Sequence, residues 1–346
     1  MERTIINSQA AALLPLYAHS VEEKPQNILV PVTQSITKQT PETLPFIEAN
    51  TKEITTDHLQ KDCIIPVFSK DNEVTISHQS FIAAIQEAAC RVFPFERFST
   101  PAIRVSHIVK GRIPEAIYKP VNQLLDSDKT IYYERMMFCF DIPTIHHDID
   151  GCTLNLTIGG VRAYNEQNLY AKKSPERFKI FIGFKNLVCC NLCVSTDGYM
   201  SSLRVMDTAA LANAAESLFR SYALEQHLAL MSAYTGCSLT ESQFAQFLGR
   251  SRMYQFLSTQ EKRSIPELLL TDTQVNLVAR SYYEDKHFGK NGDTAISLWK
   301  MFNLLTGANK SSYIDNFLDR AANATDLTTG LARALRGDAS YAWFIQ

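Results

Sequence analysis

The sequence lacks several features that would place it in a functional class at once. It contains no run of about 18 apolar residues, so no segment is expected to span a bilayer. Its net charge is -2 at neutral pH, which creates no strong overall field toward nucleic acid or an anionic membrane. The N-terminal stretch MERTIINSQAAALLPLYAHS has an apolar piece broken by polar residues, and we do not expect a signal peptide. We therefore expect a cytoplasmic protein with no membrane partner.

Catalytic and cofactor motifs are also missing. The sequence contains no G-x-S-x-G, no H-E-x-x-H and no dinucleotide-binding fingerprint. The stretch TGANKSSYIDNF resembles a phosphate loop but lacks its first glycine and follows a predicted helix. Two interpretations stay open for Lys310, Ser311 and Ser312: they begin a helix and bind one phosphate, or they form a turn between helices. We expect no cofactor, and the sequence favours a protein without enzymatic activity.

The eight cysteines are scattered along a chain without a secretory signal, which favours reduced thiols over disulfides. In the stretch FKNLVCCNLCVSTDG, Cys190 and Cys193 have the spacing of half a zinc site. A structural zinc site needs a second pair of ligands, and the sequence has no second pair at suitable spacing. We therefore predict a buried strand over this stretch, with Cys190 on one face and Cys189 and Cys193 on the other.

Length and patterning predict an α+β protein in three parts. The chain has 346 residues, which is long for a single ordinary core. Residues 1–60 are polar and rich in proline, and we expect a flexible N-terminal arm there. Residues 61–205 are predicted to form a central, mostly antiparallel sheet with a flanking helix. Residues 206–346 are predicted to form an all-helical domain.

Periodicity predicts several individual elements. Apolar residues recur at helical spacing between Ser77 and Phe93. The stretches CTLNLTIGG and RFKIFIGFKN alternate as strands do, and the pair Asp150-Gly151 indicates a hairpin turn before the first of them. One face of the second strand is expected to carry Phe178, Ile180, Ile182 and Phe184. Capping boxes at Thr240 and Thr271 indicate the starts of two helices.

Basic and aromatic side chains are interleaved between residues 162 and 185. Basic groups neutralise phosphates and aromatic rings stack on bases, which together allow binding of single-stranded nucleic acid. An alternative is the edge of a sheet whose solvated lysines discourage pairing with another sheet. With the stretch IRVSHIVKGRIP, the first interpretation predicts a binding surface made of Arg104, Lys110, Arg112, Arg162, Tyr164, Tyr170, Lys172, Lys173, Arg177, Lys179 and Lys185.

Two shorter patterns suggest further sites. LTESQFAQFLGRSRMYQFLS resembles a helix-turn-helix with its turn at Gly249, which would place Arg250, Ser251 and Arg252 at the start of a recognition helix. Basic and acidic residues nearly balance over residues 206–346, so no basic field supports docking on DNA. In DIPTIHHDID, the weak candidates for metal ligands are His146, His147 and Asp148. The alternative is a solvated hairpin tip, where polar residues collect without any function.

Several long strings, taken together, resemble one family. They include IRVSHIVKGRIPEAI, TIYYERMMFCFDIPTI, LNLTIGGVRAYN, FKIFIGFKNLVCCNLCVSTDGY and LWKMFNLLTGANKSSYIDNFLDRA. Over about residues 60–346 the chain resembles the uncharacterised domain-of-unknown-function family 3871 of Bacteroidetes. FKNLVCCNLC and LWKMFNLLTG are distantly similar to phage- and plasmid-related proteins of unknown function. The resemblance implies a bacterial mobile element as the setting, and it transfers no catalytic residue.

Three functions stay open from the sequence. The first is a protein without enzymatic activity that binds single-stranded or double-stranded nucleic acid. The second is a protein-interaction factor that acts on a host protein through the helical part and the N-terminal arm. The third is a metal-dependent nuclease that uses His146, His147 and Asp148.

Overall fold

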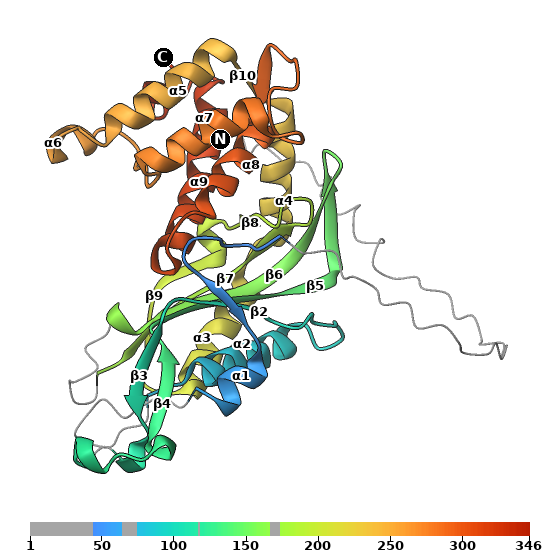
Figure 1. Cartoon of the computed structure of the whole chain (residues 1–346). Coiled ribbons are helices and arrows are strands. Elements are labelled where there is room, and N and C mark those ends of the chain that lie inside the picture. The colour runs from blue at the N-terminus through green and yellow to red at the C-terminus, as the bar shows by residue number, and fades with distance from the viewer. Residues whose placement is uncertain (1–43, 64–74, 117, 167–173) are drawn as a thin grey trace, which may run out of the picture. The chain divides into compact units, whose positions relative to one another are not determined.

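The computed structural model describes residues 44–63, 75–116, 118–166 and 174–346 (Figure 1). Residues 1–43, most of the predicted N-terminal arm, lie outside the described residues. Residues 44–346 form one compact unit, and the boundary predicted between residues 205 and 206 falls inside it. Residues 44–60 differ from the expected arm, because they contain a strand that pairs with the central sheet and part of a short helix. The combination of an antiparallel sheet and helices confirms the predicted α+β class.

An antiparallel sheet of seven strands forms the centre of this unit. The strands follow the order β1 (Lys52–Ile54), β2 (Ala102–Val105), β5 (Arg135–Ile149), β6 (Cys152–Ala163), β7 (Glu176–Asn186) and β8 (Leu192–Cys193), and β9 (Tyr199–Val205) also pairs with β7. Two smaller sheets stand apart from it. They pair β3 (Ile108–Arg112) with β4 (Lys129–Tyr133), and β10 (Ser238–Thr240) with β11 (Ala295–Ser297).

Two helices precede most of the sheet strands in the sequence, and the other described helices follow them. Their bounds are α1 (Thr56–Lys61), α2 (His78–Val92), α3 (Thr208–Ser221), α4 (Leu224–Ala233), α5 (Glu241–Tyr254), α6 (Thr259–Lys262), α7 (Asp272–Glu284), α8 (Leu298–Asn309) and α9 (Ile314–Ala334). The predicted helix between Ser77 and Phe93 is confirmed as α2, and the predicted capping boxes at Thr240 and Thr271 are both present. None of the described helices is long and apolar enough to cross a membrane.

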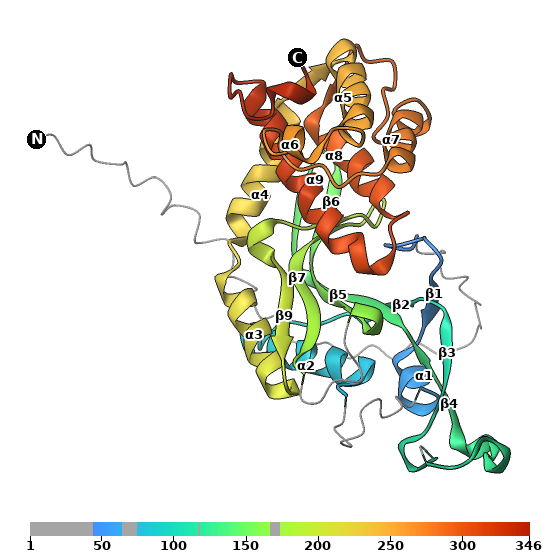
Figure 2. The ribbon, with the colours of Figure 1, turned by 90° about the vertical axis from the view of Figure 1, so that its left-hand side faces the viewer.

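The two faces of the sheet are covered by different helices (Figures 1 and 2). α2 and α3 pack on one face, and the apolar face predicted for β7 is confirmed there, because Phe178, Ile180, Ile182 and Phe184 all lie in this core. On the other face a smaller apolar cluster joins α9 to the sheet. It contains Phe317 and Leu318 of α9, Phe46 and Ile47 of the N-terminal segment, and Met137, Cys139, Val161 and Phe181 of the sheet.

The hairpin predicted at Asp150-Gly151 is confirmed, since it joins β5 to β6 and both residues have positive φ. The strand predicted over the cysteine-rich stretch is wrong in part. β7 ends at Asn186, the chain turns through Cys189 and Cys190, and only Leu192 and Cys193 form β8. The reason is that β8 folds back to pair with β7, which requires a turn where a continuous strand was expected. All eight thiols are free, and burial raises the pKa of Cys189 to about 12.

A buried arginine links the start of α2 to two central strands. The side chain of Arg162 is fully buried and pairs with Glu176 of β7. Its guanidinium also donates to the carbonyl of Ile76, while the backbone N–H of Ile76 donates to Glu176 at 2.9 Å. The rings of Tyr164 and Phe178 lie 4.4 and 4.6 Å from its central carbon. A buried cation paired in this way leaves an uncompensated charge if either partner is removed.

We predict that Arg162→Ala lowers the free energy of unfolding by about 3–5 kcal/mol, because it leaves the mostly buried Glu176 carboxylate without its counter-charge. Urea denaturation measures this change. The control is Lys110→Ala at an exposed position, which is expected to stay within about 0.5 kcal/mol of the unsubstituted protein. Equal stability of the Arg162 and Lys110 variants would show that the buried pair is not needed for the fold.

Two buried histidines predict a loss of stability in acid. Burial lowers the pKa of His78 from 6.5 to about 3 and that of His227 to about 4. Below pH 6.5 these histidines are therefore protonated in the unfolded chain and neutral in the folded chain. The free energy of unfolding is fully present above about pH 6.5 and decreases toward pH 4. Each histidine lowers it by up to ~1.4 kcal/mol per pH unit. We expect the free energy of unfolding, measured by urea denaturation between pH 7.5 and 5, to fall less steeply with decreasing pH in His78→Gln than in the unsubstituted protein. An unchanged slope would contradict this account.

Candidate functional site

The residues predicted to bind nucleic acid do not form one exposed surface. Arg162 and Tyr164 are buried in the core described above. Lys179 and Lys185 lie on the face of β7 opposite its apolar side chains, and both are paired. Lys179 Nζ donates to Asp319 Oδ2 of α9 at 2.8 Å, and Lys185 Nζ lies 2.5 Å from Asp141 Oδ2. These four groups serve the fold, which sequence periodicity alone did not show.

The other basic residues of that prediction are spread over several elements. Tyr170, Lys172 and Lys173 lie outside the described residues. Arg104 on β2 donates to Thr51 Oγ1 at 3.1 Å, and Arg112 on β3 donates to the Lys119 carbonyl at 2.7 Å. Lys110 on β3 and Arg177 on β7 are exposed but belong to different sheets.

The helix-turn-helix prediction is wrong. α5 continues from Glu241 to Tyr254 without a turn at Gly249, so Arg250, Ser251 and Arg252 lie in its final turns and do not begin a new helix. Glycine lowers the stability of a helix by only ~1 kcal/mol, and buried contacts of α5 outweigh that cost. Arg250 lies over the Trp343 ring at 5.1 Å, Ser251 is buried and Arg252 pairs with Asp272.

Of the two interpretations of Lys310, Ser311 and Ser312, the structure supports the turn, which lies between α8 and α9, and not the start of a helix that binds phosphate. Lys310 is the C-cap of α8, and its buried ammonium donates to the Cys189 carbonyl. Ser312 accepts from Gln274 Nε2 at 2.7 Å and is also buried. Ile314 begins α9.

The candidate metal ligands lie on a stretch of β5 that pairs with β6 on one side and with no described strand on the other. Strand β2 pairs with Met136 to Cys139 only, and a bulge between Ile142 and His146 follows. His146, His147 and Asp148 are exposed beyond this bulge. Among the described residues, no three His, Cys, Asp or Glu side chains are grouped so that they could hold a metal ion. Polar residues at an unpaired strand edge discourage pairing with another sheet, which accounts for their presence here.

A projecting hairpin is the most distinctive exposed feature. β3 and β4, with the connecting residues 113–128, form an arm that extends away from the central sheet (Figures 1 and 2). We call residues 108–116 and 118–133 the arm, and residues 113–116 and 118–128 its tip. Among these described residues of the tip, three large apolar side chains face solvent: Tyr118, Val121 and Leu125 are 79%, 75% and 63% exposed. The sequence signal for this feature is a loop with apolar residues between two short strands, which the sequence analysis missed.

Polar contacts brace the tip. The Asp128 carboxylate accepts from Lys119 Nζ at 2.7 and 2.9 Å and from the backbone N–H of Leu125 at 2.9 Å. These contacts lower the pKa of Asp128. The ends of the tip are also joined, because the N–H of Ile113 donates to the Asp128 carbonyl at 3.0 Å. These contacts therefore tie Ile113, Lys119 and Leu125 to the last residue of the tip.

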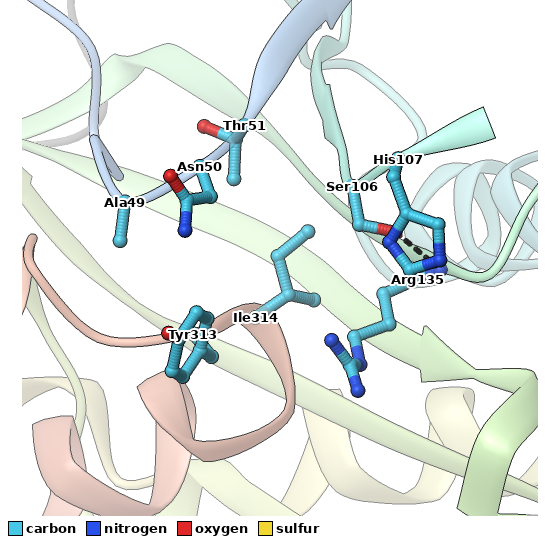
Figure 3. Close-up of a pocket in the computed structure, with 8 residues that line it drawn as sticks. All are labelled: Ala49, Asn50, Thr51, Ser106, His107, Arg135, Tyr313 and Ile314. Atoms are coloured by element: carbon cyan, nitrogen blue, oxygen red, sulfur yellow. Dashed lines mark hydrogen bonds between the residues drawn. The ribbon is translucent and has the colours of Figure 1, made fainter.

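A groove lies where the arm leaves the rest of the chain (Figure 3). It has a volume of about 260 Å³ and is lined by Ala49, Asn50, Thr51, Ser106, His107, Arg135, Tyr313 and Ile314. A second hollow of about 470 Å³ shares Asn50, Thr51, Ser106 and His107 and reaches Ile108, the first residue of the arm. In Figure 3 the Arg135 side chain extends toward the start of α9, where its Nε lies 3.5 Å from Asp315 Oδ2. The groove thus offers hydroxyl, amide and imidazole groups around an apolar floor.

Comparison with known proteins gives a family but no activity. A protein-family model described as "Domain of unknown function, B. Theta Gene description (DUF3871)" matches residues 24–345. No curated protein and no solved structure matches the chain.

We predict that Asp128→Ala loosens the tip, because it removes the acceptor of both Lys119 Nζ and the Leu125 N–H. Hydrogen exchange measured by mass spectrometry should become faster for peptides within residues 113–128 and stay unchanged in the central sheet. Asp126→Ala is the matched control, since it removes an exposed ion pair with Lys129 in the same loop. Equal exchange in the two variants would mean that Asp128 does not brace the tip.

Proposed function

Because the chain belongs to this family of unknown function, we propose its function from its own geometry: it binds a partner protein through the tip of the arm. The observation that carries the proposal is the exposure of Tyr118, Val121 and Leu125 on one braced, projecting loop. Single exposed apolar side chains are common on proteins, but a group of them presented together indicates a binding site. The proposal keeps the protein-interaction function expected from the sequence, but assigns it to the arm formed by β3 and β4 in place of the helical part and the N-terminal residues.

The energetics of burial support these residues as anchors. Burying a leucine or valine side chain completely contributes roughly 1.5–3 kcal/mol, and an aromatic side chain adds a large contact area. The brace of the tip reduces the conformational entropy that binding would otherwise remove. The partner would accordingly offer apolar pockets, and the groove at the base of the arm provides room for a second contact.

Charge does not mark the arm for a membrane. The arm carries four basic and three acidic residues, and Asp126 pairs with Lys129 while Asp128 pairs with Lys119. This near balance provides no polybasic segment of the kind that anionic lipids attract, so we propose a protein with an apolar pocket as the partner. The setting that goes with the proposal is a bacterial cytoplasm with a host protein as the partner. Its support is the free state of the eight thiols.

The geometry supports the other two functions less well. Of the residues expected to bind phosphates and bases, several are buried or paired within the chain, and the exposed ones lie on separate elements. A nuclease would need metal ligands, and the described residues provide no such group.

The proposal predicts that the triple substitution Tyr118→Ser, Val121→Ser and Leu125→Ser weakens partner binding at least about tenfold, since it removes the apolar anchors. Partners are first captured from a bacterial lysate and identified by mass spectrometry. The purified partner is then titrated by calorimetry against the triple variant and the unsubstituted protein. Phe95→Ser is the matched control, because Phe95 is a 96% exposed aromatic residue outside the arm. This variant should bind the partner with the same affinity as the unsubstituted protein.

Equal affinity of the triple variant and the unsubstituted protein would disprove the role of the tip. A fluorescence polarisation titration with single-stranded DNA and RNA at low salt tests the nucleic-acid alternative. Tight, salt-sensitive binding that the triple substitution does not change would favour that alternative over our proposal.

A further inference from the structure

Three reactive side chains meet at the end of α1. The thiol of Cys63 lies 3.7 Å from His58 Nε2, and His58 Nδ1 lies 2.8 Å from Asp62 Oδ2. Because a carboxylate only accepts, Nδ1 carries the proton of the imidazole ring and Nε2 presents a lone pair. A thiol, a base beside it and a carboxylate that orients the base are the parts of an activated nucleophile. We call these three residues the Cys63 cluster.

Contacts from distant parts of the chain hold this cluster in position. Leu59 of α1 is buried in the main core and fixes the helix against it. The hydroxyl of Tyr133, the last residue of β4, donates to His58 Nε2 at 2.9 Å. The cluster is therefore more than a chance grouping of neighbours in sequence, because a residue of the arm completes the environment of its base.

The thiol is protonated at rest and only partly buried. Burial and the neighbouring Asp62 carboxylate raise the pKa of Cys63 to about 11, so at neutral pH the sulfur keeps its proton. Its reactivity then depends on a base that removes the proton during attack. Cys63 is half-buried, in contrast to Cys139 and Cys193, which are enclosed in the core.

We propose that Cys63 is a nucleophile that accepts an acyl group from an ester or thioester, with His58 as its base and Asp62 as the positioning residue. The Sγ–H proton passes to His58 Nε2 while sulfur forms a bond to the acyl carbon. The bond from that carbon to the leaving oxygen or sulfur breaks, and the leaving group takes the proton from His58. This activity is distinct from partner binding by the tip, and its test requires no partner.

The test uses the full chain with p-nitrophenyl acetate as the acyl donor. Mass spectrometry of peptides gives the rates of acetylation of Cys63 and of the exposed Cys90 in the same sample. We expect Cys63 to react at least about 100-fold faster than Cys90 at neutral pH, because general-base catalysis contributes roughly that factor or more. His58→Asn should remove this advantage and leave the Cys90 rate unchanged.

Two further variants separate activation from a structural role. Asp62→Asn should lower the Cys63 rate, and Asp62→Glu should restore part of it by returning the carboxylate. Tyr133→Phe removes the competing O–H from Nε2, so the Cys63 rate should be maintained or increased. Thermal melting of each variant confirms that it is folded.

The proposal is overturned if Cys63 reacts no faster than Cys90, or if His58→Asn lowers the melting temperature without changing the Cys63 rate. Either result would mean that His58 serves only to connect α1 with β4.

Discussion

The burial of Arg162 is the constraint on which the central sheet depends. A guanidinium cannot be deprotonated inside a protein, so the fold must supply counter-charge, hydrogen-bond acceptors and polarisable surfaces for it. Glu176 supplies the charge, the Ile76 carbonyl accepts a hydrogen bond, and two aromatic rings flank the cation. Arg162 lies on β6, and its partners come from the residues just before α2, from β7 and from the turn after β6, so satisfying one charge fixes how these segments meet.

The same requirement explains why a basic, aromatic stretch became part of the interior. β7 alternates, so Phe178, Ile180, Ile182 and Phe184 face α2 and α3, while Lys179 lies on the other face with Phe181, toward α9. α9 carries acidic residues in its first two turns, and Asp319 meets Lys179 there. Basic residues that could have bound phosphates thus pair with carboxylates of the same chain, as Lys179 does with Asp319 and Arg162 with Glu176. Charge composition alone does not reveal this, because the two partners are far apart in sequence.

The parts of the fold that could be predicted from the sequence are those that local physics decides. The turn at Asp150-Gly151, the caps at Thr240 and Thr271 and the apolar face of β7 follow from backbone preferences and side-chain spacing. The candidate sites could not be predicted in this way. The exposure of Tyr118 depends on which loop projects from the sheet, and the contact between His58 and Tyr133 joins α1 to β4. Such pairings are set by the tertiary fold, which a single sequence does not display.

Tyr133 ends the second strand of the arm and also holds the imidazole of His58. A displacement of β4 that moves Tyr133 would therefore change a hydrogen bond of His58 near Cys63, although the tip lies at the other end of the strand. If binding at the arm and a modification at Cys63 both move Tyr133, thermodynamic linkage requires each of them to change the equilibrium of the other by the same factor. β4 thus connects the arm to the Cys63 cluster through the hydrogen bond between Tyr133 and His58.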